Sequence, residues 1–362
     1  PSPEPDKMTR PLRSITDGQG RKVTLYYIAD PLLAGNNPSY GPNLLGLLHS
    51  LRFNQTFNTN GDLLSYCESK PTYGATPPRS LGAATTTYYW RTSPYASWQN
   101  RVLSKNEYSY NALTGQKTAN LFTDNYGNQR TETYTYDELS RLKTVNYGDG
   151  QTQSYSFDSM GNRVAKTDNL AGSETYSYNN ANMLLNRVVG GTNQTYTNDT
   201  NGNTLSGNGR TMTWDSQNRI ANCVTGVSSS QKTSTFTYGS DGIRRRMTVV
   251  SANGNPTYTT DYVLDGHNVV QELTTTSVNV NPVVTATYMM GPQGPLYKRP
   301  TNSTDVRWYI YDGGSNVTGE VDPAGNVTAS KKHDVYGATR SSSGSATSKQ
   351  SWQGGVGHQS DE

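Results

Sequence analysis

Few residues of this chain are of a type that performs acid–base or metal chemistry, and their spacing does not assemble a site. The four histidines are His49, His267, His333 and His358. None has the spacing of a metal-ligand set or lies beside a Gly-x-Ser-x-Gly nucleophile motif. His333 precedes an aspartate in a predicted turn, which indicates a solvated turn residue. The sequence therefore predicts that the chain is not an enzyme and binds no metal or cofactor.

Carboxylates and aromatic rings do recur together at a fixed spacing, as in Tyr134–Asp137 and Tyr155–Asp158. Repeated aspartates can suggest Ca²⁺ sites, but no segment has the alternating oxygen ligands of an EF-hand loop. Catalytic residues also have no need to recur along a chain. The repetition therefore favours a structural role for each aspartate, as the residue that caps a turn.

The repeated unit reads aromatic-x-aromatic-Asp-x-x-Gly, with Asn or Ser as substitutes for the glycine, and an apolar residue follows the turn. It recurs at a spacing of about 20 residues, which is typical of an array of supersecondary units. The copies enter at Tyr108, Phe122, Tyr134, Tyr155, Tyr176, Tyr196, Met212, Phe236, Tyr262, Tyr288 and Tyr309.

Hairpin chemistry accounts for this unit. Side chains alternate between the two faces of a strand, so both aromatic residues share one face and the Thr or Ser between them lies on the other. An aspartate at the first turn position accepts hydrogen bonds from nearby backbone amides. Glycine suits the fourth position because it adopts positive φ without steric cost. Glycine has this position after Asp17, Asp124, Asp158, Asp199, Asp322 and Asp334, and the predicted substitutes are Ser140, Asn182, Asn218, Asn268 and Ser315.

A lone hairpin is marginally stable in water, so the copies must pair edge to edge. The sequence predicts an all-β fold, in which an array of hairpins builds one long coiling sheet of shell-like or solenoid-like form. The open edges of such a sheet leave two outcomes. Either the sheet coils around an interior, or its ends pair with other chains in a filament.

Composition agrees with a polar β fold. Charged residues make up 16% of the chain and its mean hydropathy is −0.78, yet it contains 26 tyrosines. Disordered chains are poor in aromatic residues and rich in charge, whereas Tyr and Thr favour strands. The 31 basic and 28 acidic residues give a net charge of +3, which does not indicate a nucleic-acid partner. No run of about 18 apolar residues predicts a membrane span.

A second group of aromatic residues lies in a stretch interrupted by prolines. Tyr88, Tyr89, Trp90, Tyr95 and Trp98 are the candidate ligand contacts of this chain. Rings exposed in irregular loops could stack on sugars or hold a partner protein. The alternative, which we favour, is that they fill a core beside a degenerate repeat.

Cys67 and Cys223 are the only cysteines, and the sequence leaves open whether they pair. Two cysteines form neither a disulfide framework nor a metal site. The chain begins Pro-Ser-Pro without an apolar signal segment and stops at Asp361-Glu362. We therefore expect a mature or excised piece of a longer protein.

The repeats resemble the YD repeats of the Rhs family, which bacteria share with the teneurins of animals. The resemblance rests on Tyr134–Leu142, Tyr155–Val164 and Thr213–Ile220, and Val321–Thr328 resembles the Asp-Pro-x-Gly variant of those arrays. It covers residues 108–340 well and 11–66 weakly. Residues 354–362 resemble the lead into the Rhs-associated core, whose Thr-Gly-Leu and Tyr-Tyr-Asp-Pro continuation is absent from this sequence.

Pattern and resemblance together predict four segments. Residues 1–11 are an extended lead-in, 12–107 are degenerate YD-like repeats with irregular loops, 108–340 are the regular array, and 341–362 are a Ser/Gly-rich segment leading towards the core. In toxin-bearing members of the family the core is followed by a self-cleavage site and a variable toxic domain. Neither is present in these residues.

The resemblance implies a non-catalytic structural segment of a secreted or surface protein, part of a β-shell that encloses or presents a C-terminal toxin or effector domain. The alternative is an extracellular structural or adhesive protein whose repeats form filaments or bind glycans. The expected partners are the rest of the same polypeptide or copies of the chain at the sheet edges, with glycans or cell-surface molecules as a further class. Nucleic acid is not expected as a partner, and the expected location is secreted, extracellular or at the cell surface.

Overall fold

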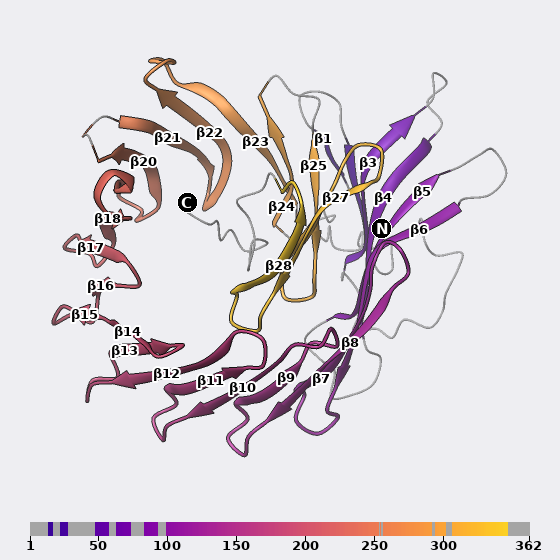
Figure 1. The fold of residues 1–362 in the computed structure, drawn as a ribbon. Coiled ribbons are helices and arrows are strands. Elements are labelled where there is room, and N and C mark those ends of the chain that lie inside the picture. The colour runs from indigo at the N-terminus through magenta and orange to yellow at the C-terminus, as the bar shows by residue number, and fades with distance from the viewer. Residues whose placement is uncertain are drawn as a thin grey trace, which may run out of the picture. The chain divides into compact units, whose positions relative to one another are not determined.

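The computed structural model describes residues 14–16, 22–27, 48–57, 63–73, 83–92, 99–252, 254, 256–291, 294–301 and 306–346. These residues form two antiparallel sheets of 14 strands each (Figure 1). The first sheet contains β1 (Ser14–Thr16), β2 (Lys22–Tyr27), β3 (Leu48–Phe57), β4 (Leu63–Tyr73), β5 (Ala83–Thr92), β6 (Gln99–Tyr110), β7 (Lys117–Thr123), β8 (Gln129–Tyr136), β9 (Leu142–Asn146), β10 (Thr152–Phe157), β11 (Arg163–Asp168), β12 (Gly172–Tyr178), β13 (Leu184–Val189) and β14 (Thr192–Thr195).

The second sheet contains β15 (Thr197–Asn198), β16 (Thr204–Gly207), β17 (Arg210–Trp214), β18 (Ile220–Thr225), β19 (Lys232–Tyr238), β20 (Arg244–Ser251), β21 (Pro256–Asp265), β22 (Asn268–Thr276), β23 (Val283–Gly291), β24 (Gly294–Pro300), β25 (Arg307–Tyr311), β26 (Val317–Val321), β27 (Val327–His333) and β28 (Thr339–Gly344). A single 3-10 turn, η2 (Ser228–Ser230), joins β18 to β19. In the described part of the chain, no helix is long and apolar enough to cross a membrane.

Within each sheet the strands follow one another in sequence order, so every strand pairs with its neighbours along the chain. The predicted all-β array of hairpins is confirmed. This local connectivity follows from the turn in each repeat, because a short turn returns the chain beside the strand it has just left.

The ladder is divided at Tyr196, where one extended segment changes partner. Before it, Thr195 pairs with Asn186 of β13; after it, Thr197 pairs with Ser206 of β16. Gly207 lies directly against the Tyr196 ring, so a side chain at Gly207 would overlap the ring. The predicted continuous sheet is therefore present as two ladders that meet at one residue.

Contacts divide the chain into two compact units. Unit 1 consists of residues 1–131, 289–298 and 304–362, and unit 2 consists of residues 132–288 and 299–303. The predicted boundary between residues 107 and 108 falls inside β6. Early and late strands of the array thus belong to the same unit, and unit 2 is formed by residues between them.

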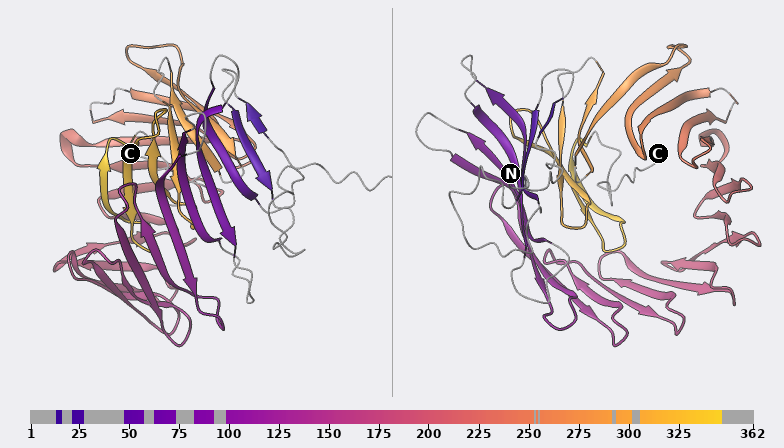
Figure 2. Two further views of the ribbon diagram at one scale, coloured as in Figure 1. Left: turned by 90° about the vertical axis from the view of Figure 1, so that its right-hand side faces the viewer. Right: turned by 180° about the vertical axis from the view of Figure 1, so that it is seen from behind.

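Unit 1 has the larger apolar core among the described residues, and early and late strands both contribute to it. Figure 2 shows early strands of the chain, in purple, beside late strands, in yellow. Tyr88 on β5 and Leu103 on β6 are 1% and 3% exposed, and they pack with Trp308 and Ile310 on β25. The same cluster includes Met289, Leu296, Tyr297, Val306, Tyr309, Tyr311, Val317 and Val321. The ring centres of Tyr297 and Trp308 are 4.6 Å apart in an edge-on arrangement.

Polar contacts join the same strands. The amide of Gly313 donates to the hydroxyl of Tyr108 at 2.6 Å, although the two residues are 205 positions apart. The Arg101 guanidinium donates to the carbonyl of Gly325. Apolar burial is the main stabilising force in such a core. The two hydrogen bonds also fix how its early and late strands are aligned.

Unit 2 shows the predicted alternation of side chains. Its aromatic entry residues are buried or half-buried, and the Thr or Ser that follows Tyr134, Tyr155, Tyr176, Tyr196 and Phe236 is exposed. A small apolar cluster forms around Met247, Val249 and Tyr262. Each hairpin of unit 2 therefore presents one polar face and one face of packed rings.

Candidate functional site: the repeated turn and the aromatic face

Most repeated turns are closed by one carboxylate, as Asp158 illustrates. Its Oδ1 accepts from the amides of Met160 and Asn162 at 3.0 and 2.8 Å, and its Oδ2 accepts from Asn162 Nδ2 at 2.9 Å. The amide of Gly161 donates to the Asp158 carbonyl at 3.2 Å. These hydrogen bonds from Asn162 and the backbone hold the pKa of Asp158 below its usual value. The two Oδ1 bonds also occur at Asp124, Asp137, Asp199, Asp215, Asp312, Asp322 and Asp334. In one copy the amide oxygen of Asn179 accepts the same two bonds, and another copy begins at Gly239.

The fourth turn position has positive φ, as the sequence predicts. Gly161 has a φ of 90°, and the substitutes Ser140, Asn182, Asn218 and Ser315 have φ values of 65°, 60°, 57° and 62°. Such a residue after a type I turn gives a three-residue hairpin loop. The other copies with glycine at this position are Gly127, Gly202, Gly325 and Gly337.

The prediction for Asn268 is wrong. Asn268 pairs directly with Asp265 across a two-residue turn, and the residue with positive φ is Gly266, at 58°. Glycine at the first central position is typical of a two-residue hairpin turn, which is shorter than the repeated turn. This copy therefore lacks the aspartate-capped loop.

A second irregularity, which was not predicted, follows the repeated turn in nine hairpins. In the Asp158 hairpin, Phe157 pairs with Arg163 but Ser156 pairs with Ala165, so Val164 is left over as a β-bulge. The bulged residue is the sixth after the first residue of the turn in the other eight hairpins as well. They are Lys143, Leu185, Leu205, Ala221, Arg245, Thr318, Thr328 and Arg340. Bulges bend a strand and increase its twist, so each repeat carries a fixed bend.

The residue just before the repeated turn bonds to the preceding hairpin in several copies. The Tyr178 hydroxyl donates to the carbonyl of Arg163 at 2.9 Å, and the Tyr238 hydroxyl donates to the carbonyl of Ile220 at 2.8 Å. We call such a bond an inter-hairpin cap when the carbonyl belongs to the fifth residue after the first residue of the preceding repeated turn. The other three caps are Trp214 Nε1 to Thr204 at 2.8 Å, Asn198 Nδ2 to Leu184 at 3.1 Å and His333 Nε2 to Val317 at 3.4 Å. The Tyr311 hydroxyl donates instead to the Pro295 carbonyl, which lies four residues after Gly291, and is not counted among the caps.

All five capped carbonyls have the same position, the fifth residue after the first residue of a repeated turn, immediately before the bulge. The last backbone pair with the next hairpin lies two residues further along the chain, for example at Ala165–Thr175 for Arg163 and at Asn222–Thr235 for Ile220. A side chain therefore takes over where backbone pairing stops. Strand backbone that loses its partner costs free energy unless another donor or acceptor replaces it. The inter-hairpin caps supply that donor.

On the aromatic face, arginines lie between the first aromatic rings of successive copies. The Arg163 guanidinium carbon is 4.8 Å from the Tyr176 ring centre and 5.9 Å from that of Tyr155. Arg244 has the same place between Phe236 and Tyr262, at 5.2 and 5.3 Å. Cation–π contact of this kind stabilises the stack and covers ring faces.

Glu174 joins these rings and arginines to a network of charges. It accepts from the Tyr176 hydroxyl at 2.6 Å and from Arg187 Nε at 2.8 Å, and Lys166 lies 3.7 Å away. Burial and the bond to Glu174 raise the pKa of Tyr176 to about 12. Tyr176 is therefore protonated at neutral pH and serves as a hydrogen-bond donor.

The structure describes the side chain of one predicted ligand contact, Tyr88. Tyr88 is 1% exposed and lies in the core of unit 1, so its ring offers no surface to a ligand. Tyr89 and Trp90 belong to β5, but their side chains lie outside the described part, as do Tyr95 and Trp98 entirely. Their contact with a ligand stays a prediction.

The remaining candidate groups are placed as follows. His267 is exposed in a turn, whereas His333 is half-buried at the end of β27, which corrects its predicted place as a solvated turn residue. His49 belongs to β3, with an undescribed side chain, and His358 lies outside the described residues. Cys223 is a free thiol. Within the described residues, no cluster of three His, Cys, Asp or Glu side chains could hold a metal.

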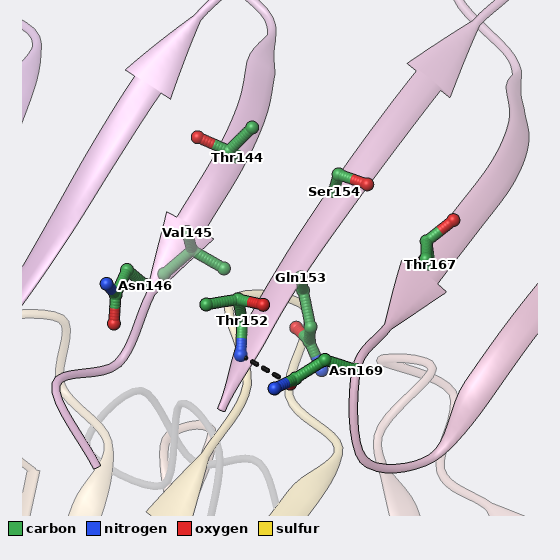
Figure 3. Close-up of a pocket in the computed structure, with 8 residues that line it drawn as sticks. All are labelled: Thr144, Val145, Asn146, Thr152, Gln153, Ser154, Thr167 and Asn169. Carbon is green, nitrogen blue, oxygen red and sulfur yellow. Dashed lines mark hydrogen bonds between the residues drawn. The ribbon is translucent and has the colours of Figure 1, made fainter. Parts of the chain in front are cut away.

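An open hollow of about 230 Å³ lies on β9–β11 (Figure 3). Its lining is neutral: Thr144, Val145, Asn146, Thr152, Gln153, Ser154, Thr167 and Asn169. Asn169 Oδ1 accepts from the Thr152 amide at 2.8 Å, and Asn169 Nδ2 donates to the Gly150 carbonyl at 2.8 Å. These bonds fix the adjoining turns, so the polar groups at this end of the hollow are used within the sheet.

Comparison with known proteins assigns no family. No protein-family model matches the chain, and no curated protein matches it. Among solved structures, the crystal structure of TcdB2-TccC3 is similar at 13% identity and a TM-score of 0.46, with 91% of this chain and 20% of that chain covered. TcdB2-TccC3 without its hypervariable C-terminal region gives 12% identity and a TM-score of 0.48, covering 94% and 21%.

A third similar structure is the Tc holotoxin pore of Photorhabdus luminescens with the TccC3 mutation D651A. It is 11% identical, with a TM-score of 0.46 and coverage of 90% of this chain and 23% of that chain. The present chain thus spans about a fifth of the length of the toxin-complex chains it matches. At these identities and TM-scores the similarity assigns neither an activity nor a partner to it.

Proposed function

We propose that this chain is a non-catalytic structural segment of a secreted or surface-exposed Rhs-like YD-repeat protein. It forms part of a β-wall that encloses or presents a C-terminal toxin or effector domain carried outside this sequence. The observation that carries the proposal is the core of unit 1, in which Tyr88 and Leu103 of early strands pack with Trp308 and Ile310 of a late strand.

The early and late strands of the array share a core, which favours a wall and argues against a filament. Unpaired strand edges are templates for other chains, and a filament built through them keeps both ends of each array available. Here β5 and β6 are packed with β25 in the same unit, and the Tyr108–Gly313 bond fixes their position. This arrangement suits a sheet that returns on itself.

The repeated residues support a structural role. Each turn carboxylate accepts bonds from the amides of its own loop, as Asp158 does from Met160 and Asn162. A carboxylate held in this way is a poor general base, because its lone pairs are occupied and the pKa of Asp158 is already lowered. Repeated rings are likewise engaged by arginines, which argues against the stacking of sugars on them.

The proposed partner is the rest of the same polypeptide, and the proposed location is outside the cell or at its surface. Electron microscopy of the natural protein with its full reading frame tests both proposals. We expect closed particles with the downstream domain protected from protease until the particle is opened. Filaments with this segment as the repeating subunit would overturn the proposal.

A glycan array tests the adhesive alternative. Binding by the parent chain that is lost in Trp90→Ala and Trp98→Ala would favour adhesion. No binding by the parent chain would end that alternative.

A further inference from the structure

One of the five inter-hairpin caps is made by a side chain that titrates near neutral pH. Tyr178, Asn198, Trp214 and Tyr238 keep their donor hydrogen over the physiological range, but the fifth cap is the imidazole of His333. Histidine changes charge between about pH 5 and 8, so a small change in its surroundings alters its state. The same structural position thus has a constant donor in four hairpins and a titratable one in the fifth.

His333 is placed where backbone pairing between two hairpins ends. It is the last residue of β27 and pairs with Thr339 across the repeated turn. Pairing of β26 with β27 ends at Gly319–Ser330, and Gly319 lies two residues after Val317. The ring reaches the Val317 carbonyl at 3.4 Å. Since a carbonyl only accepts, Nε2 is the donor. The imidazole ring therefore holds the end of β27 against β26.

The carboxylates near the ring are already committed to their turns. Asp312 accepts from the amides of Gly314 and Asn316 and from Asn316 Nδ2, at 2.8, 3.0 and 2.8 Å. Asp334 is 3% exposed and accepts from the amides of Tyr336 and Ala338, both at 2.9 Å. Asp312 thus uses both carboxylate oxygens, and Asp334 uses Oδ1, to close its own turn.

We propose that His333 is an acid-sensitive clasp, in which the neutral ring holds the β27–β28 hairpin against β26 and the protonated ring releases it. Protonation keeps the Nε2 donor but brings a full charge into a half-buried site. Opening the hairpin exposes that charge to water. The inference concerns unit 1 alone and is independent of whether the chain encloses another domain.

The direction of the pH effect follows from the surroundings of the ring. Burial lowers the pKa of His333, and Lys331 acts in the same direction, while the Val317 carbonyl, Asp312 and Asp334 oppose them. A group whose pKa is lower in the folded state favours folding in its neutral form. The clasp is therefore complete above about pH 6.5, the ordinary histidine value, and is lost as the pH falls through the lower folded value.

Amide hydrogen exchange between pH 4.5 and 8 tests the clasp, after correction for the intrinsic pH dependence of exchange. In the natural chain we expect peptides of β27 and β28 to lose protection as the pH falls below about 6.5, while β17–β19 keep theirs. Each unit by which the folded pKa lies below the unfolded one makes opening about tenfold more frequent at full protonation. His333→Asn and His333→Tyr place non-titrating donors at the position, and we expect both to remove this loss. His267→Asn, at an exposed turn, is the matched control and should behave as the parent.

Titration of the histidine NMR signals of the unmodified chain gives a second measurement that needs no variant. We expect the His333 resonance to titrate below pH 6.5. A His333 midpoint at or above 6.5, or an equal loss of protection in His333→Tyr or His333→Asn, would overturn the proposal. If both variants fail to fold, the NMR midpoint decides the outcome alone.

Discussion

The hydroxyl of Tyr178 donates a 2.9 Å hydrogen bond to the carbonyl of Arg163, which belongs to the preceding hairpin. The bond lies just past the last backbone pair between β11 and β12, Ala165–Thr175. The tyrosine before the turn is thus part of the connection between repeats, as well as part of the aromatic face. It explains why this position so often carries a residue with an O–H or N–H group.

Tyr178→Phe keeps the ring and removes the donor. We expect the free energy of unfolding to fall by about 1 kcal/mol, because the Arg163 carbonyl loses its partner and the net contribution of such a bond is of that size. Urea denaturation measures the loss, and hydrogen exchange should localise it to β11–β12. Tyr126→Phe is the control, since Tyr126 is 83% exposed at a turn tip and we expect no change there. Equal effects of the two changes would contradict the role of the cap.

Ser140 and Gly161 occupy the same turn position with different conformational cost. Both have positive φ, 65° and 90°, and a side chain at Gly161 would meet nothing within 4 Å. Strain in the backbone is therefore the only cost of a Cβ there. We expect Ser140→Gly to raise the free energy of unfolding and Gly161→Ser to lower it, each by about 1 kcal/mol. Thermal denaturation of both variants checks the pair, and shifts of the same sign would refute the argument.

The lowered pKa of Asp168 predicts that the fold loses stability in acid. The side chain is 3% exposed, and burial alone would raise its pKa, but the amides of Gln153 and Gln151 and the backbone amides of Leu170 and Ala171 lower it to about 2. Since the folded pKa lies below the unfolded value of about 3.9, the carboxylate stabilises the fold above pH 3.9 and this contribution is lost as the pH falls towards 2. The contribution at neutral pH is about 2 kcal/mol.

Asp168→Asn removes that pH dependence. We expect the variant to be less stable than the parent at pH 7 and the difference to shrink between pH 4 and pH 2, as measured by urea denaturation. Glu138→Gln, an exposed turn residue, is the control. A stability difference that stays constant over this pH range would show that ionisation of Asp168 is not its source.

Leu103 links early and late strands of unit 1. It is 3% exposed on β6 and belongs to the cluster that contains Trp308 and Val317. Leu103→Ala leaves a cavity, and such changes cost about 2–5 kcal/mol. We expect hydrogen exchange to accelerate in β25 and β26, far away in sequence. Leu113→Ala, where the leucine is 95% exposed, should leave both strands unaffected. Acceleration confined to β6 and β7 would show that the shared core does not couple them.

The hairpins could be predicted from sequence because their determinants are local. Asp158 and Gly161 lie three residues apart, and the backbone amides that Asp158 binds lie within the same loop. The inter-hairpin caps could not be predicted, because the distance from Tyr178 to Arg163 depends on where the backbone ladder ends. The place of Tyr88 was open for a related reason: its neighbours lie some two hundred residues away, and no local pattern identifies them.

Phe157 allows the opposite test to Tyr178→Phe, in which a cap is added instead of removed. It has the position of Tyr178 in the preceding copy but carries no donor, and the Arg141 guanidinium lies 4.9 Å from its ring centre. By analogy with the other hairpins, the carbonyl to be capped is that of Leu142, the fifth residue after Asp137. Phe157→Tyr supplies the hydroxyl, and we expect the free energy of unfolding to rise by about 1 kcal/mol, with slower exchange in β9 and β10. Urea denaturation with Phe122→Tyr as the control measures the gain. A hydroxyl that finds no partner would only add a desolvation cost. A loss of stability in Phe157→Tyr would therefore mean that the cap forms in individual hairpins and is not a rule of the array.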